Sequence, residues 1–65
     1  PLTQRDIEIL RLLAEGNSLT QIGEALGLAY KTVANTLSRI KEKLGVTHTA
    51  DLIRIAIGRG LTDLR

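Results

Sequence analysis

The sequence predicts an all-α fold of four short helices, and three observations support this prediction. Leu and Ile dominate the 43% of residues that are hydrophobic, and Tyr30 is the only aromatic residue, a composition that favours helices over strands. Apolar residues recur at helical spacing, and no segment alternates with the period of a strand. Single glycines stand where the periodic segments stop. We therefore expect helices over residues 4–15, 19–26, 30–44 and 49–59.

Capping patterns mark the starts of the first two helices. Thr3 is followed three residues later by Asp6, a capping box in its acidic form. Ser18 and Gln21 have the same spacing before the second helix, so their side chains can bond the free backbone N–H groups there. Gly27 follows the second helix, where a left-handed residue is needed to end it.

The third and fourth helices are predicted from their apolar positions and end signals. The third has one narrow apolar stripe, within about 60° of arc at helical spacing. This stripe consists of Val33, Leu37, Ile40 and Leu44. Gly45 ends the third helix. Thr47 or His48 is expected to cap the fourth helix, Asp51 lies in its first turn, and Gly60 ends it.

Length and composition exclude several classes of protein. A chain of 65 residues forms one small core, so we expect a single domain over 1–65. Without Cys and with only His48, neither a metal site nor a disulfide framework is expected, and no cofactor is implied. No acid orients that His as a catalytic base would require, so we expect no enzyme activity. The chain starts at Pro1 and lacks Met, which suggests a fragment of a longer protein.

The remaining composition signals concern location and charge. No apolar run approaches ~18 residues, so neither a membrane span nor a signal peptide is expected, and we place the protein in the cytoplasm. The net charge of +2 is unevenly distributed: residues 1–30 carry two Arg and four acidic residues, whereas residues 31–65 carry seven basic and three acidic residues. Such asymmetry is typical of a protein that presents one face to a polyanion, although a chain this short also shows it by chance.

The second and third helices have the spacing of a helix-turn-helix unit. The segment between them starts with Gly27 and is three residues long. Leu28 can fill the turn, Val33 can anchor the third helix, and Gly23 is small where we expect the two helices to cross closely. An ordinary corner between two helices has the same pattern, so DNA binding needs a second observation.

That observation is the polar, basic face opposite the apolar stripe of the third helix. Asn35 has both an amide donor and an acceptor, which match N6 and N7 of adenine. Ser38 can reach either base edge, and Ala34 can contact a thymine methyl group. Glu42 shares this face near the end of the helix, so we expect that end to leave the DNA groove in which the other residues would contact bases. Four cations are available for DNA phosphates: Lys31, Arg39, Lys41 and Lys43. A solvated polar surface is the alternative interpretation.

The segment from Leu2 to Leu61 resembles the LuxR-type DNA-binding domain, also called FixJ-type or NarL-type, the four-helix output module of many bacterial transcription regulators. Four motifs carry the resemblance: L-T-Q-R-D-I-E-I-L at 2–10, A-E-G-N-S-L-T-Q-I at 14–22, K-T-V-A-N at 31–35 followed by K-L-G-V at 43–46, and A-I-G-R-G-L at 56–61. The K-T-V-A-N form is more similar to response regulators of two-component systems than to autoinducer receptors.

The resemblance implies that the third helix enters the major groove of double-stranded DNA and that the second crosses above it. The base-reading positions then fall on Ala34, Asn35 and Ser38. The implied phosphate contacts are Lys31, Thr32, either Lys41 or Lys43, and, at the start of the second helix, Ser18, Leu19 and Thr20.

The sequence also departs from the family pattern at three positions. Ala34 stands where many members have lysine, and Thr36 where they often have histidine. Because that lysine is missing, the target sequence of other members does not transfer to this chain. Ala29 replaces the usual Ser or Thr cap, which would allow the start of the third helix to shift by a residue.

The fourth helix suggests a partner. Its apolar residues cover an arc of roughly 220°, wider than one small core can cover. We expect Ile53, Ala56 and Ile57 to face inward, which leaves Leu52 and Ile55 exposed as the surface of a homodimer. The resemblance agrees, since these domains commonly dimerise through this helix. The alternative is that a receiver domain of the full-length protein covers the apolar residues.

The sequence therefore predicts a sequence-specific DNA-binding domain of a transcription regulator, acting as a homodimer. An N-terminal receiver or sensory domain and RNA polymerase are the further partners we expect. Two alternatives remain open: a sigma-factor-like domain that recognises promoters, and a helical protein-interaction module whose basic face binds an acidic partner.

Overall fold

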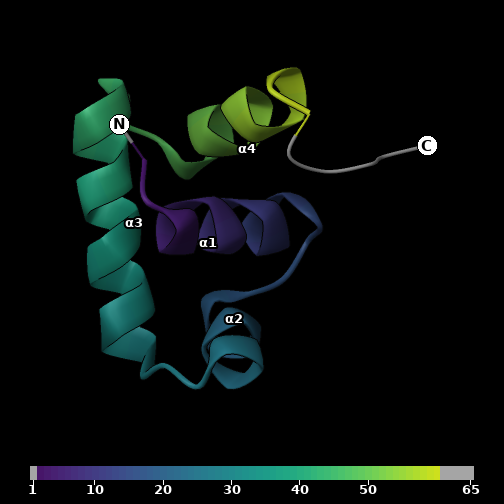
Figure 1. Ribbon diagram of the computed structural model, residues 1–65. Coiled ribbons are helices and arrows are strands. Elements are labelled where there is room, and N and C mark those ends of the chain that lie inside the picture. Colours follow the sequence, from purple (N-terminus) through teal and green to yellow (C-terminus); the bar gives the residue numbers. More distant parts are fainter. Residues whose placement is uncertain (1, 61–65) are drawn as a thin grey trace.

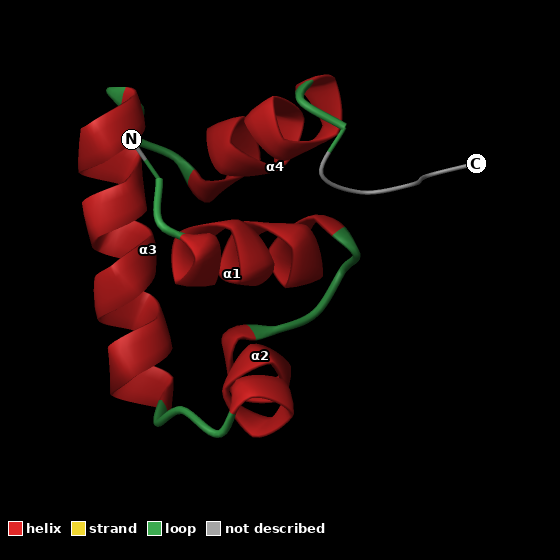
Figure 2. Ribbon diagram, viewed as in Figure 1, coloured by secondary structure: helices red, strands yellow, loops and turns green. Residues whose placement is uncertain are grey.

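A computed structural model describes residues 2–60 as four helices (Figure 1). In chain order they are α1 (Gln4–Ala14), α2 (Leu19–Leu26), α3 (Tyr30–Leu44) and α4 (Thr49–Gly58). Within that part of the chain there is no strand (Figure 2). The all-α, four-helix prediction is confirmed: α2 and α3 have the predicted ends, and α1 and α4 each end one residue early. Leu61, the last residue of the A-I-G-R-G-L motif, lies outside the described residues.

Both predicted capping boxes are present. The Asp6 N–H donates to Thr3 Oγ1 and the Thr3 N–H donates to Asp6 Oδ2, each at 3.0 Å. At the start of α2 the Ser18 N–H donates to Gln21 Oε1 at 2.8 Å, and the Gln21 N–H donates to Ser18 Oγ at 3.1 Å. These bonds fix where α1 and α2 begin, because they satisfy N–H groups that have no partner within the helix.

The turn between α2 and α3 depends on two glycines. Gly27 has φ of 70°, the left-handed conformation that glycine adopts without steric cost. Gly23 is needed for a different reason than the predicted close crossing of two helices. A Cβ built on Gly23 would lie 2.5 Å from the carbonyl oxygen of Leu28, so the close approach is to the backbone of the turn. The Leu28 N–H also donates to the Gly23 carbonyl at 2.8 Å.

The two later helices begin without a side-chain cap. Ala29 is the N-cap of α3 and His48 the N-cap of α4, and neither side chain bonds a backbone N–H. The start of α3 nevertheless stays at Tyr30, so the missing Ser or Thr at position 29 does not shift it. The Val33 N–H donates to the Ala29 carbonyl at 3.1 Å, and Val33 itself is fully buried, so backbone bonding and packing both act at this end.

The core is built around α1, which contacts each of the other three helices. In Figure 1, α1 lies between α2 and α4, and α3 runs along one side of the molecule. Nine apolar side chains form the buried core: Ile9, Leu10, Leu13, Ile22, Val33, Leu37, Ile40, Leu52 and Ala56. The predicted stripe of α3 is buried except at Leu44, which is half-buried.

The structure corrects the predicted orientation of α4. Leu52 was expected on the surface, but it is fully buried, together with Ala56 one turn later. Ile57 was expected inside, but 43% of its surface is exposed. Ile53 and Ile55 are half-buried. The prediction was wrong because an apolar arc this wide fits several rotations of the helix, and packing against α1 selects the one with Leu52 inward.

A candidate nucleic-acid interface on α2 and α3

The outer face of α3 carries the residues predicted to contact bases. Asn35 and Ser38 are exposed, and Ala34 is half-buried. Val33 and Leu37 are buried in the core, so the polar side of α3 is turned outward. A polar helical face on a rigid support is what direct contact with base edges in a groove requires.

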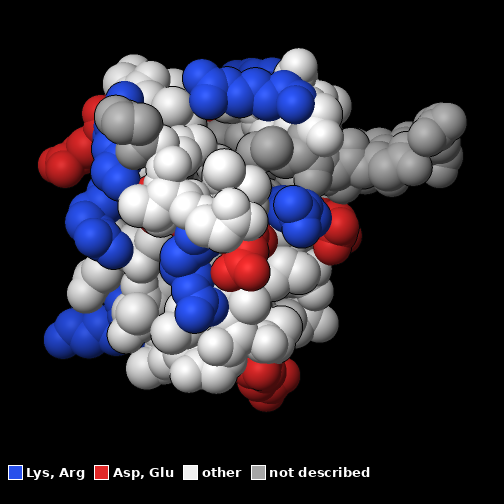
Figure 3. All heavy atoms as spheres, viewed as in Figure 1, with Lys and Arg blue, Asp and Glu red and all other residues white. Residues whose placement is uncertain are grey.

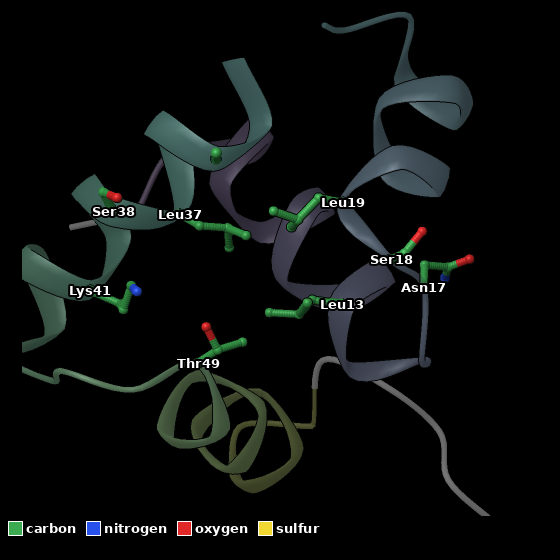
Figure 4. A pocket seen from close by; sticks show the side chains of 9 residues that line it. Leu13, Asn17, Ser18, Leu19, Leu37, Ser38, Lys41 and Thr49 are labelled. Atoms are coloured by element: carbon green, nitrogen blue, oxygen red, sulfur yellow. The ribbon is translucent and has the colours of Figure 1, made fainter. Parts of the chain in front are cut away.

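A pocket of about 360 Å³ brings the start of α2 next to α3. It is lined by Leu13, Asn17, Ser18, Leu19, Ala34, Leu37, Ser38, Lys41 and Thr49. Figure 4 shows the side chains of Leu13, Leu19 and Leu37 pointing into it, while Ser38 and Lys41 lie along its α3 wall. Residues predicted separately as base contacts and as phosphate contacts therefore share one pocket. Sequence reasoning missed Asn17 and Thr49, whose place in the lining depends on how the helices meet.

The start of α2 is held in place by Asn17 and Ser18. The Asn17 Nδ2 donates to the carbonyl oxygen of Leu12 at 2.8 Å and so ties the loop to the end of α1. Ser18 Oγ accepts from the N–H of Gln21. The N–H groups of Leu19 and Thr20, in the first turn of α2, have no acceptor inside the helix. Such N–H groups attract anions.

Positive charge lies along α3. Figure 3 shows Lys and Arg side chains on the side of the molecule that α3 forms in Figure 1. Lys31, Thr32 and Arg39 are exposed and Lys41 is half-buried. Within residues 2–60, the three ion pairs involve Arg5, Lys43 and Arg54. The cations at positions 31, 39 and 41 therefore have no carboxylate partner in the described chain.

Lys43 is different from the other cations of α3. Its Nζ lies 2.9 Å from Oδ2 of Asp6, whose side chain is only 6% exposed. Burial raises the pKa of Asp6, but hydrogen bonds from Thr3 and Lys43 and the Lys43 charge outweigh burial, so this pKa lies below its ordinary value of 3.8. Lys43 thus joins α3 to the start of α1, a contact that no local sequence pattern indicates.

Thr36 is a further residue that the sequence did not single out as functional. It is only 4% exposed, and its Oγ1 accepts a hydrogen bond of 3.2 Å from a guanidinium nitrogen of Arg39. The spacing of three residues is the only sequence signal for this contact, since side chains at i and i+3 lie on the same side of a helix.

Within the described chain there is neither a cluster of metal ligands nor a membrane-spanning helix. No three His, Asp or Glu side chains of residues 2–60 come together as metal ligands would. None of the four helices is long and apolar enough to cross a membrane.

A short capped helix, a glycine turn and a second helix with an exposed polar face define a helix-turn-helix domain. Comparison with known proteins assigns its family. Residues 1–56 match the family of bacterial regulatory proteins called the luxR family. The chain belongs to this family and is a DNA-binding domain of the LuxR transcriptional-regulator type.

Several curated proteins are similar to nearly the whole chain. It is 43% identical over 63 residues to the transcriptional regulatory protein MctR of Rhizobium johnstonii, covering 97% of this chain and 29% of that protein. It is 43% identical over 60 residues to the transcriptional activator protein ExaE of Pseudomonas putida, covering 92% of this chain and 28% of that protein. It is 38% identical over 64 residues to the transcriptional regulatory protein DegU of Brevibacillus brevis, covering 98% of this chain and 27% of that protein. The chain therefore spans less than a third of the length of these relatives.

Proposed function

We propose that α3 enters the major groove of double-stranded DNA while α2 crosses above it. The observation that carries this proposal is the pocket between the two helices, whose α3 wall includes Ala34 and Ser38. Asn35 is exposed on the same outer face. These three side chains contact base edges, and Asn35 supplies the most specific contact because its amide can bond adenine through both a donor and an acceptor.

Phosphate contacts surround these base contacts. On α2 they come from Ser18, Leu19 and Thr20, where free N–H groups attract an anion. On α3 they come from four further residues: Lys31, Thr32, Arg39 and Lys41. The family resemblance offered either Lys41 or Lys43, and we choose Lys41 because Lys43 is engaged by Asp6.

Helix α4 supplies the surface of a homodimer in this proposal. Ile57 is 43% exposed and Ile55 half-buried, so apolar area is available on the outer side of α4. Leu52 takes no part, because it is fully buried against α1. Two copies related by a two-fold axis would contact half-sites about 10 bp apart on the duplex.

The longer relatives support a larger protein around this domain. We propose an N-terminal receiver or sensory domain that controls DNA binding, as in a two-component response regulator, with RNA polymerase as the partner of the bound complex. Since the proposed partner is bacterial DNA, we place the protein in the cytoplasm. The domain itself performs no catalytic step in this proposal.

The test is selection of duplexes from a random pool, followed by fluorescence anisotropy with the selected and a scrambled duplex. We expect tighter binding to the selected duplex and a steep fall in affinity with salt, of slope about −0.9 per phosphate contact. Equal affinity for both duplexes would contradict sequence-specific DNA binding. Salt-sensitive binding without discrimination would instead favour the alternative of a basic face for an acidic protein.

A further inference from the structure

Thr36 has an unusual position for a polar side chain in this domain. Among residues 2–60 it and Asp6 are the two polar or charged residues that are buried. Asp6 caps α1 and pairs with Lys43. The hydroxyl of Thr36 has a single side-chain partner in the described chain, the guanidinium of Arg39 at 3.2 Å. A buried hydroxyl that holds an exposed cation needs an explanation beyond packing, since valine would fill the same space without a polar group.

Arg39 lies on the flank of α3 that faces away from the pocket. It follows Asn35 by four positions, so the two stand about 40° apart around the helix. Lys41, which lines the pocket, is about 160° away from Arg39. A helix in the major groove has one DNA backbone on each side, so these two cations point toward different strands.

We propose that Thr36 is a positioning residue that holds Arg39 ready to bind a DNA phosphate on the flank opposite the pocket; this inference rests on the proposed function. Arg39 forms no ion pair with the described residues and has five N–H donors, which match phosphate oxygens. A long side chain loses rotamer freedom when it binds, and a hydrogen bond to a fixed, buried hydroxyl removes part of that cost beforehand. The side of α3 that lines the pocket and the side that carries Arg39 then bind one DNA strand each.

The experiment is a double-mutant cycle of Thr36→Val and Arg39→Ala, measured by fluorescence anisotropy on the selected duplex. We expect Thr36→Val to weaken binding about three- to tenfold, the usual range for one hydrogen bond. In the Arg39→Ala background the same substitution should change affinity by less than about twofold, because no guanidinium remains to be held. Thr36→Ser keeps the hydroxyl and should bind within about twofold of the unsubstituted chain.

Two matched controls exclude simpler explanations. Thr47→Val makes the same change at an exposed loop residue, and Arg5→Ala removes a cation from α1. Urea unfolding of every variant shows whether the fold is retained. If Thr36→Val fails to fold, the pair Thr36→Ser and Thr36→Ala gives the same comparison with smaller side chains.

Phosphate mapping locates the contact. Methylphosphonates replace the phosphates of the selected duplex one at a time, which removes one negative charge at each position. One replacement should weaken binding of the unsubstituted chain yet have little effect on Arg39→Ala and a reduced effect on Thr36→Val. A Thr36→Val effect that persists in full in the Arg39→Ala background would overturn the inference, as would no effect at all. Failure of the unsubstituted chain to select any duplex would instead overturn the proposed function.

Discussion

Helices α3 and α4 both pack on α1, yet they present different chemistry to the outside. On α3 the buried side is apolar and the outer side polar, with Asn35 and Ser38 exposed. On α4 apolar residues lie on both sides: Leu52 is fully buried and Ile57 is 43% exposed. The comparison shows how one small core supports two kinds of surface. A polar face suits a polyanion, whereas exposed apolar area suits a second protein surface.

The largest expected effect separates the two sides of α4. Leu52→Ala should lower the free energy of unfolding by about 2–5 kcal/mol, because it leaves a cavity against α1. Ile57→Ala, on the outer side of the same helix, should cost under about 1 kcal/mol. Urea unfolding measures both values. Equal losses for the two variants would show that α4 is not oriented as described.

The next effect separates two lysines of α3. Lys43→Met should lower the free energy of unfolding by about 1–3 kcal/mol, because the buried carboxylate of Asp6 loses its ammonium partner. Lys41→Met, with no ion pair among the described residues, should leave stability nearly unchanged and reduce the salt slope of DNA binding by about 1. If Lys43→Met reduced the salt slope while stability stayed constant, the division of roles between these lysines would be wrong.

Acid should weaken the contact between Asp6 and Lys43. The pKa of Asp6 is lower in the folded chain than its ordinary value of 3.8, so the unfolded chain takes up the proton first as the pH falls. The stabilisation is complete above that ordinary value and is lost as the pH falls from it through the lower, folded pKa. Urea midpoints between pH 5 and pH 2 should therefore decrease more in the unsubstituted chain than in Lys43→Met. A parallel decrease would mean that Lys43 does not lower this pKa.

The same contrast explains what sequence could predict. The stripe of α3 is narrow, so only one rotation buries it, and the exposed positions Asn35 and Ser38 followed directly. On α4 several rotations bury a similar area, and only contact with α1 places Leu52 inside. Asp6 and Lys43 lie 37 positions apart in the sequence. The capping-box pattern predicts the bond from the Thr3 N–H to the Asp6 carboxylate, but it does not predict the bond from Lys43. The contact between Thr36 and Arg39 is local, but many side chains have the same spacing without bonding.

A fourth prediction tests the outer face of α3. Asn35→Ala should cost roughly 1–3 kcal/mol on the selected duplex and much less on a scrambled one, because only the correct base pairs with the amide. Arg5→Ala, on α1, serves as a control outside the proposed interface. Anisotropy titrations with both duplexes measure the difference. An equal loss on the two duplexes would assign Asn35 a phosphate contact instead of a base contact.

The smallest expected effect concerns the outer face of α4. Ile57→Asp places a charge on the proposed dimer surface and should leave the fold intact, since this side chain is already 43% exposed. Binding to a duplex with two half-sites should weaken about three- to tenfold, whereas binding to a single half-site should not change, because only the former depends on contact between two copies. Sedimentation of the complexes gives the number of chains bound to each duplex. If two copies of Ile57→Asp still bind with full affinity, dimerisation uses another surface and the exposed apolar area of α4 serves a different partner.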